Sequence, residues 1–170
     1  ILGNLASNIC QQDKTAIVIS LEMSEDMYSK RLSSQMSKIP FKDLRENSPT
    51  LKEFAEAHKS ENPNGRLFIK EFPPKSVTVS HIRAYIEKLI QKKGITPDVI
   101  IIDYVNLLSP TVVTGNSYTD IKAVTEQLRA LSYLFGCPIV TATQLNRDAF
   151  NKVDPGLEST SESMGLSMTA

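Results

Sequence analysis

Three polar side chains each follow a short apolar run, and their types suit one kind of chemistry. Glu22 follows TAIVIS and Leu21, Asp103 ends DVIIID, and Gln144 follows PIVTAT. Short runs rich in β-branched residues are typical of buried strands. Polar residues that follow parallel strands lie in the crevice where such sheets bind ligands. The pattern therefore predicts that Glu22, Asp103 and Gln144 converge at one sheet edge.

Two carboxylates and an amide at such an edge are suited to metal-assisted phosphoryl transfer. One acidic group can hold Mg²⁺ and a second can polarise the attacking water. Asp103 has the form of a Walker B aspartate, Glu22 of the water-activating carboxylate, and Gln144 of a γ-phosphate sensor. Taken singly, each is more often a solvated loop residue or a helix cap, so the interpretation depends on all three together.

Strands and helices are expected to alternate along the chain. Apolar residues at helical spacing and helix-start signals predict helices over 2–9, 24–39, 79–93 and 117–135, and a further helix that begins at Ser48. Apolar runs predict strands over 15–20, 66–72, 98–103 and 138–143. Strands that are apolar on both faces call for a parallel sheet with helices on both sides. The expected fold class is α/β.

Two of the helix starts carry capping signals. Ser24 precedes Glu25 and Asp26, so its side-chain oxygen can cap free backbone N–H groups while the acidic pair faces the positive helix end. The pattern Ser117-x-x-Asp120 has the form of a capping box. We therefore expect Ser24 and Ser117 to cap their helices.

Composition excludes several other classes of protein. The 170 residues carry 19 Lys plus Arg against 19 Asp plus Glu, a formal net charge of zero, which argues against a general polyanion coat but allows a local basic loop on nucleic acid. No apolar run approaches the roughly 20 residues of a membrane span. Cys10 and Cys137 are far apart, and we expect core thiols in a reducing compartment. His58 and His81 have no partners at ligand spacing, so no metal beyond nucleotide-bound Mg²⁺ is expected.

The chain contains no G-x-x-x-x-G-K-[ST] phosphate loop. That loop normally lies between a strand and the helix that it opens, whereas this sequence begins within a helix that precedes the run at 15–20. We therefore expect a fragment of a larger fold, cut after the phosphate loop and before the closing strands. Such a fragment alone should not hydrolyse nucleotide, because most phosphate contacts come from the missing loop.

Several segments resemble DnaB-type replicative helicases. VISLEMSEDMYSKRLSSQMSKIPFKDLRE is similar to the stretch after that family's phosphate loop, DVIIIDYVNLLSP to its Walker B strand, and TATQLNRDAF to its Gln-Leu-x-Arg sensor strand. GNSYTDIKAVTEQLRAL and SESMGLSMTA are most similar to the replicative helicases of T-even-type bacteriophages. The resemblance covers essentially the whole chain. It implies that residues 1–170 are a partial RecA-like motor domain of a P-loop NTPase, without the Walker A loop and the C-terminal strands.

The resemblance also implies an activity and partners. The family forms hexameric rings that encircle single-stranded DNA and unwind duplexes by hydrolysing ATP or another NTP with Mg²⁺. It implies a homo-hexamer that meets a primase and a helicase loader in the cytoplasm, that of the host if the protein is phage-encoded. By position, Glu22 and Gln144 correspond to catalytic residues, and Asp103 and Arg147 to nucleotide-binding residues, with Asp103 also associated with Mg²⁺.

The family's channel-facing loops match residues 109–116 and 145–165. Asn116, Arg147 and Lys152 are the candidate DNA contacts there, because backbone N–H groups and a few cations can track phosphates without reading bases. One departure is that Ser161 stands where many bacterial members carry the arginine of Arg-Glu-Ser-Gly, so any contact made by that arginine does not carry over.

Two alternatives remain open. A RecA-type recombinase or repair ATPase would share Glu22 and Asp103, but the SLEMS segment and the Gln-Leu-x-Arg strand favour the helicase. A non-hydrolysing DNA-binding or assembly subunit would keep the sheet without the phosphate loop. The presence of Glu22, Asp103 and Gln144 together argues against that reading, because a dead site has no need of buried strand-end carboxylates.

Overall fold

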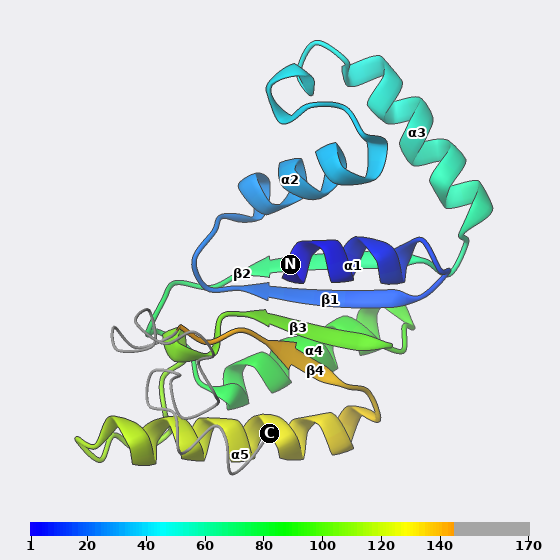
Figure 1. The fold of residues 1–170 in the computed structure, drawn as a ribbon. Coiled ribbons are helices and arrows are strands. Elements are labelled where there is room, and N and C mark those ends of the chain that lie inside the picture. The colour runs from blue at the N-terminus through cyan, green and yellow to red at the C-terminus, as the bar shows by residue number, and fades with distance from the viewer. Residues whose placement is uncertain (145–170) are drawn as a thin grey trace, which may run out of the picture.

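Four parallel strands form one sheet in the computed structural model, which describes residues 1–144 (Figure 1). The strands are β1 (Thr15–Ser20), β2 (Arg66–Glu71), β3 (Val99–Asp103) and β4 (Ile139–Thr141), in the spatial order β2-β1-β3-β4. All three neighbouring pairs are parallel. The expected α/β fold class and the parallel sheet are confirmed.

Helices cover both faces of this sheet (Figure 1). They are α1 (Leu2–Cys10), α2 (Glu25–Ser37), α3 (Ser48–Glu61), α4 (Val79–Lys93) and α5 (Ser117–Phe135), with short 3₁₀ turns η1 (Phe41–Asp43) and η2 (Val105–Leu107). The helices α1 and α2 lie on one face and α4 and α5 on the other, while α3 lies beyond α2, away from the sheet. No residue of α3 is buried.

The two central strands are buried on both faces, which explains their continuous apolar runs. Val18 and Ile101 face α1 and α2, where they pack with Tyr28 and Leu32. Alternate side chains of the same strands face α4 and α5, and these are Ile17, Ile19, Ile100 and Ile102. Because side chains of a strand alternate between faces, an apolar layer on each side requires an apolar residue at every position.

Strand register aligns the carboxyl ends of the strands. Ser20 pairs with Asp103 on one side and with Glu71 on the other. The backbone contact continues past the strand, because the Leu21 N–H donates to the Asp103 carbonyl at 2.8 Å. The last residues of three strands therefore lie side by side at one edge of the sheet.

One of the two predicted helix caps is confirmed and the other is wrong. Ser24 caps α2, since its side chain accepts a hydrogen bond from the Met27 N–H at 3.2 Å. The capping box expected at Ser117 and Asp120 is wrong. Asn116 caps α5 instead, and Asp120 reaches back to Thr114, where its carboxylate accepts from both the backbone N–H and the hydroxyl.

Two expected boundaries shift by a few residues. The helix predicted to reach Ile39 ends at Ser37, because Lys38 adopts a left-handed conformation with φ of 60°. The strand predicted over 138–143 is limited to Ile139–Thr141. After it, the Ala142 carbonyl accepts a hydrogen bond from the Val105 N–H in η2, so the chain leaves the β3 ladder.

Both cysteines are buried free thiols, as expected. Burial raises the pKa of the Cys10 thiol to about 11 and also raises that of Cys137. Thiols with raised pKa values are protonated at neutral pH and react poorly. Within residues 1–144, no helix has the length and apolar character needed to cross a membrane.

Candidate functional site

Glu22 lies in the short loop that joins β1 to α2. The preceding strand is wholly buried and Leu21 is 1% exposed, whereas Glu22 is exposed. Ser20 closes the loop, since its hydroxyl donates to the Met23 carbonyl at 2.6 Å and accepts from the Met23 N–H at 3.1 Å. The loop therefore presents the Glu22 carboxylate to solvent from an anchored strand end.

Asp103 ends β3, directly beside the start of that loop. Its side chain is partly buried, and burial and the nearby Glu22 charge raise the pKa of its carboxyl, partly offset by the positive charge of Arg31. The peptide bond from Asp103 to Tyr104 is cis. Glu22 and Asp103 thus lie close enough to interact electrostatically, on the ends of adjacent strands.

A cavity of about 320 Å³ opens beside Asp103. It is lined by the first residues of α1, by one face of α2 and by the ends of β3 and β4; the α2 residues are Tyr28, Arg31, Leu32 and Gln35. Burial, together with the Asp103 charge, raises the pKa of the Tyr28 hydroxyl, while Arg31 lowers it. A carboxylate and a guanidinium in one cavity can serve a cation and an anion together, as a metal-bound phosphate requires.

A larger hollow of about 510 Å³ lies between α4 and α5. Its lining includes Val79, Leu131 and Leu134, and its only charged residue among those described is Arg83. None of its described lining residues belongs to a strand or ends one. The chemistry of the strand ends, and not the size of the hollow, therefore identifies the smaller cavity as the candidate site.

Gln144 lies on the same sheet edge through its contact with the residue after Asp103. Its amide donates to the Tyr104 hydroxyl at 2.9 Å, and the neighbouring Thr143 hydroxyl donates to the Asn106 side-chain oxygen at 2.8 Å. These contacts hold the segment after β4 against η2. Gln144 is exposed and is not among the residues that line the cavity beside Asp103.

The other residues singled out in the sequence lie farther away or outside the described part. Asn116 caps α5, and its side-chain oxygen accepts from the backbone N–H groups of Tyr118 at 3.0 Å and Thr119 at 3.3 Å. Arg147 and Lys152, together with the rest of the loop at 145–165, lie outside residues 1–144.

Sequence reasoning gave no role to Arg31 or to the strand-end residue Glu71. Arg31 lies three residues after Tyr28 on α2, a spacing that places both on one helix face and could have indicated that they share a site. Glu71 ends the third strand at this edge, where its carboxylate accepts from the Glu25 N–H at 3.1 Å. Only the position of Glu71 after an apolar run could have indicated it.

The residues present fit a magnesium–nucleotide complex better than a metal held by protein alone. Within residues 1–144, no three His, Cys, Asp or Glu side chains come together as a metal cluster. Mg²⁺ in nucleotide sites usually takes one or two carboxylates and completes its shell with phosphates and waters. Asp103 beside Glu22 and Arg31 supplies such a partial set.

Comparisons with known proteins agree with this arrangement. The family model described as the DnaB-like helicase C-terminal domain matches residues 1–164. The chain is 30% identical over 175 residues to the DnaB-like replicative helicase of Enterobacteria phage T4, covering 99% of this chain and 37% of the phage protein. It is 28% identical over 159 residues to the replicative DNA helicase DnaB of Mycobacterium intracellulare, covering 91% of this chain and 27% of that protein.

Solved structures show the same fold. A DnaB-like replicative helicase, described with its interactions with primase, superposes with a TM-score of 0.78 at 22% identity, covering 97% of this chain and 40% of that one. The ATPase domain of G40P gives 0.79 at 20% identity, covering 99% and 63%. These matches show the RecA-like fold, and the match to the family model shows the family to which the sequence belongs. The chain belongs to the family of DnaB-like helicase C-terminal domains.

Proposed function

We propose that this chain is part of a replicative DNA helicase that couples hydrolysis of ATP or another NTP to translocation on single-stranded DNA. The observation that carries the proposal is the placement of Glu22 and Asp103 on adjacent strand ends, within electrostatic reach of each other and beside the cavity that holds Arg31. Family membership supports it, and the relatives named above are replicative helicases.

Each residue of the site takes one role in this reaction. Asp103 would hold the Mg²⁺ that accompanies the nucleotide, and Arg31 would bind phosphate oxygens, since both residues line the same cavity. When bound, the magnesium ion neutralises charge on the phosphates. The Glu22 carboxylate orients the attacking water and takes its proton as the new bond forms between the water oxygen and the terminal phosphorus. The bond from that phosphorus to the bridging oxygen breaks, and the nucleoside diphosphate leaves with this oxygen. Gln144 senses the terminal phosphate, and Arg147 binds the nucleotide beside it.

The proposal extends to the assembly. Residues 1–170 form a partial RecA-like motor domain, and the Walker A loop and the closing strands belong to other parts of the intact protein. Six copies form a ring around single-stranded DNA, which Asn116, Arg147 and Lys152 contact. Primase and a loader are its partners, and the cytoplasm its compartment. The length of the relatives supports this view, because the chain spans only 37% of the phage protein.

Replacing Glu22 by Gln in the intact protein tests the central assignment. The amide cannot accept the proton from water but keeps the size of the side chain, so hydrolysis should fall by about 100-fold or more while nucleotide affinity stays within about twofold. Glu61→Gln is the matched control, because Glu61 is exposed at the end of α3. Steady-state hydrolysis and equilibrium binding of a non-hydrolysable analogue are the measurements.

Either of two results would contradict the assignment. Hydrolysis by Glu22→Gln at the rate of the unmodified protein would remove Glu22 from the reaction. An equal loss in the Glu61→Gln control would show that the charge of the protein, and not this carboxylate, sets the rate.

A further inference from the structure

The loop that carries Glu22 is held at its start by the central strands. The Ser20 carbonyl accepts from the Phe72 N–H at 2.9 Å, just past the end of β2, and the Leu21 N–H donates to the Asp103 carbonyl at 2.8 Å. Ser20 then bridges both backbone groups of Met23 through its hydroxyl. The loop is therefore fixed to β2 and β3 before Glu22 is reached.

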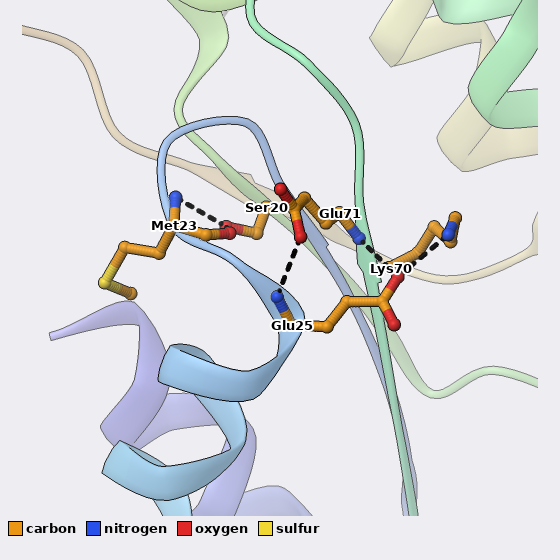
Figure 2. A network of polar contacts seen from close by, with 5 residues as sticks. All are labelled: Ser20, Met23, Glu25, Lys70 and Glu71. Carbon is orange, nitrogen blue, oxygen red and sulfur yellow. Dashed lines mark hydrogen bonds and ion pairs between the residues drawn. The ribbon is translucent and has the colours of Figure 1, made fainter.

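The end of the loop is held by a second set of contacts, between the start of α2 and the end of β2 (Figure 2). The Glu25 carboxylate accepts from the Glu71 N–H at 3.1 Å, and the Glu71 carboxylate accepts from the Glu25 N–H at 3.1 Å. Lys70 adds an ion pair to Glu25 at 2.8 Å. We call the two reciprocal hydrogen bonds and this ion pair the Glu25–Glu71 clamp.

Electrostatic interactions stabilise both hydrogen bonds of this clamp. Glu25 is the first residue of α2, so the Glu71 carboxylate binds a free N–H group at the positive end of a helix dipole. The Lys70 ammonium and the Glu71 N–H together lower the pKa of the Glu25 carboxyl, which keeps it ionised. Two like charges can lie near each other here because each carboxylate accepts a backbone N–H and the lysine compensates one of them.

Glu22 itself has no comparable support. Within residues 1–144, its side chain forms no hydrogen bond or ion pair. Its position relative to Asp103 thus depends on backbone anchors on both sides of it, Ser20 with Met23 before α2 and Glu25 with Glu71 at the start of α2. A carboxylate that must orient one water is sensitive to displacement, and a shift of about 1 Å can lower a rate by about 100-fold.

We propose that Glu25 and Glu71 are positioning residues that fix the loop on which Glu22 meets the attacking water. This inference rests on the proposed function, in which Glu22 is the water-activating carboxylate. The clamp contributes through the backbone of α2 and makes no contact with the nucleotide. It therefore sets how well Glu22 works, not how tightly the nucleotide binds.

The test uses Glu71→Ala and Glu71→Gln in the intact protein. Alanine removes the acceptor for the Glu25 N–H, whereas the amide oxygen of Gln keeps an acceptor at the same reach. We expect Glu71→Ala to lower kcat about tenfold with KM and analogue affinity within about twofold, and Glu71→Gln to restore kcat to within about twofold. Glu25→Ala removes the opposite hydrogen bond and should repeat the loss. Glu61→Ala is the control, with the same charge change at an exposed position.

A double variant separates this proposal from the proposed function. If Glu71 acts through Glu22, adding Glu71→Ala to Glu22→Gln should give no further loss in single-turnover hydrolysis. A slow Glu22→Gln beside a fully active Glu71→Ala overturns the clamp and leaves the proposed function intact. A fully active Glu22→Gln overturns both.

Thermal unfolding completes the test. Two results would show that these residues act only on stability and would overturn the inference. One is a Glu71→Gln variant as slow as Glu71→Ala. The other is a loss of kcat that follows the thermal midpoint in all variants.

Discussion

Gln144 donates a hydrogen bond to the Tyr104 hydroxyl at 2.9 Å, which joins the segment after β4 to the residue after Asp103. The amide of Gln144 has a second N–H, so this contact can orient the side chain and still leave a donor for a phosphate oxygen. Tyr104 is partly buried, whereas Gln144 is exposed. Burial therefore restricts the side chain of Tyr104 more than that of Gln144.

The Tyr104→Phe substitution removes this contact and keeps the ring. If Gln144 senses the terminal phosphate, kcat in the intact protein should fall about fivefold, because one neutral hydrogen bond contributes about 1 kcal/mol. Tyr133→Phe is the control, because Tyr133 is 76% exposed on α5. Steady-state hydrolysis is the measurement. An unchanged kcat, or an equal loss when Gln144 is already Ala, would show that Tyr104 does not act through Gln144.

The charge of the Asp103 carboxylate should lower the stability of the folded protein, although the proposed reaction requires it. Because its pKa is raised, the folded protein binds a proton there more readily than the unfolded chain does, and stability falls as pH rises through the raised pKa. Asp103→Asn removes the charge, so its thermal midpoint at neutral pH, without nucleotide, should exceed that of the unmodified protein. The difference should shrink on acidification, and hydrolysis in the intact protein should fall about 100-fold.

The exposed Asp26→Asn variant is the control for this effect, since within residues 1–144 Asp26 pairs only with Lys30 on the same helix. A lower midpoint for Asp103→Asn than for the unmodified protein would show that the Asp103 charge stabilises the fold, contrary to the expectation.

Asp13 should make the fold sensitive to acid in the opposite direction. Its carboxylate accepts hydrogen bonds from the Asn64 side chain and from the backbone N–H groups of Asn64 and Gly65. These hydrogen bonds lower the pKa of Asp13, and the one from the Asn64 side chain has the largest effect. The stability that they provide is present above the ordinary pKa of aspartate and is lost as pH falls through the lowered value. Asp13→Ala should lower the urea concentration at the midpoint of unfolding at neutral pH. Below a pH of about 4, this midpoint should decline less steeply than that of the unmodified protein.

Urea unfolding of both proteins across this pH range measures the effect. Asp43→Ala is the control, because within residues 1–144 the Asp43 carboxylate accepts no hydrogen bond. Parallel declines for Asp13→Ala and the unmodified protein would mean that other groups cause the loss.

Asn116 has a structural role that a DNA contact would have to share. Its oxygen caps α5, so Asn116→Ala should cost about 1 kcal/mol of stability, whereas Asn116→Ser keeps a capping oxygen and should cost much less. We expect Asn116→Ser to weaken binding to single-stranded DNA in the intact protein, since it removes the amide nitrogen. Fluorescence anisotropy measures this, and unchanged affinity in the serine variant would assign Asn116 to the helix cap alone.

The sequence was sufficient for the sheet because burial on both faces leaves a clear pattern. Residues 16–19 and 99–102 are apolar at every position, and few structures other than a central parallel strand require that. The same reasoning placed Glu22 just after a strand. The roles of Glu22, Asp103 and Gln144 stay predictions, while their shared edge follows from strand register and the Tyr104 contact.

Contacts between distant segments could not be predicted in the same way. Glu25 and Glu71 are 46 residues apart, and their reciprocal hydrogen bonds depend on how α2 meets the end of β2. The cap of α5 was predicted one residue late, because the Asp120 carboxylate binds Thr114 and leaves Asn116 to cap the helix. Local patterns give each residue several possible partners, and tertiary packing selects among them.

The central position of β1 and β3 has a consequence for hydrogen exchange. Each has a strand on both sides and a layer of helices on both faces, so their backbone amides should exchange with solvent only on global unfolding. The helix α3, which buries no residue, should exchange by local opening. Glu22 and Asp103 thus extend from the slowest-exchanging part of the chain, and their spacing should persist until the whole domain unfolds.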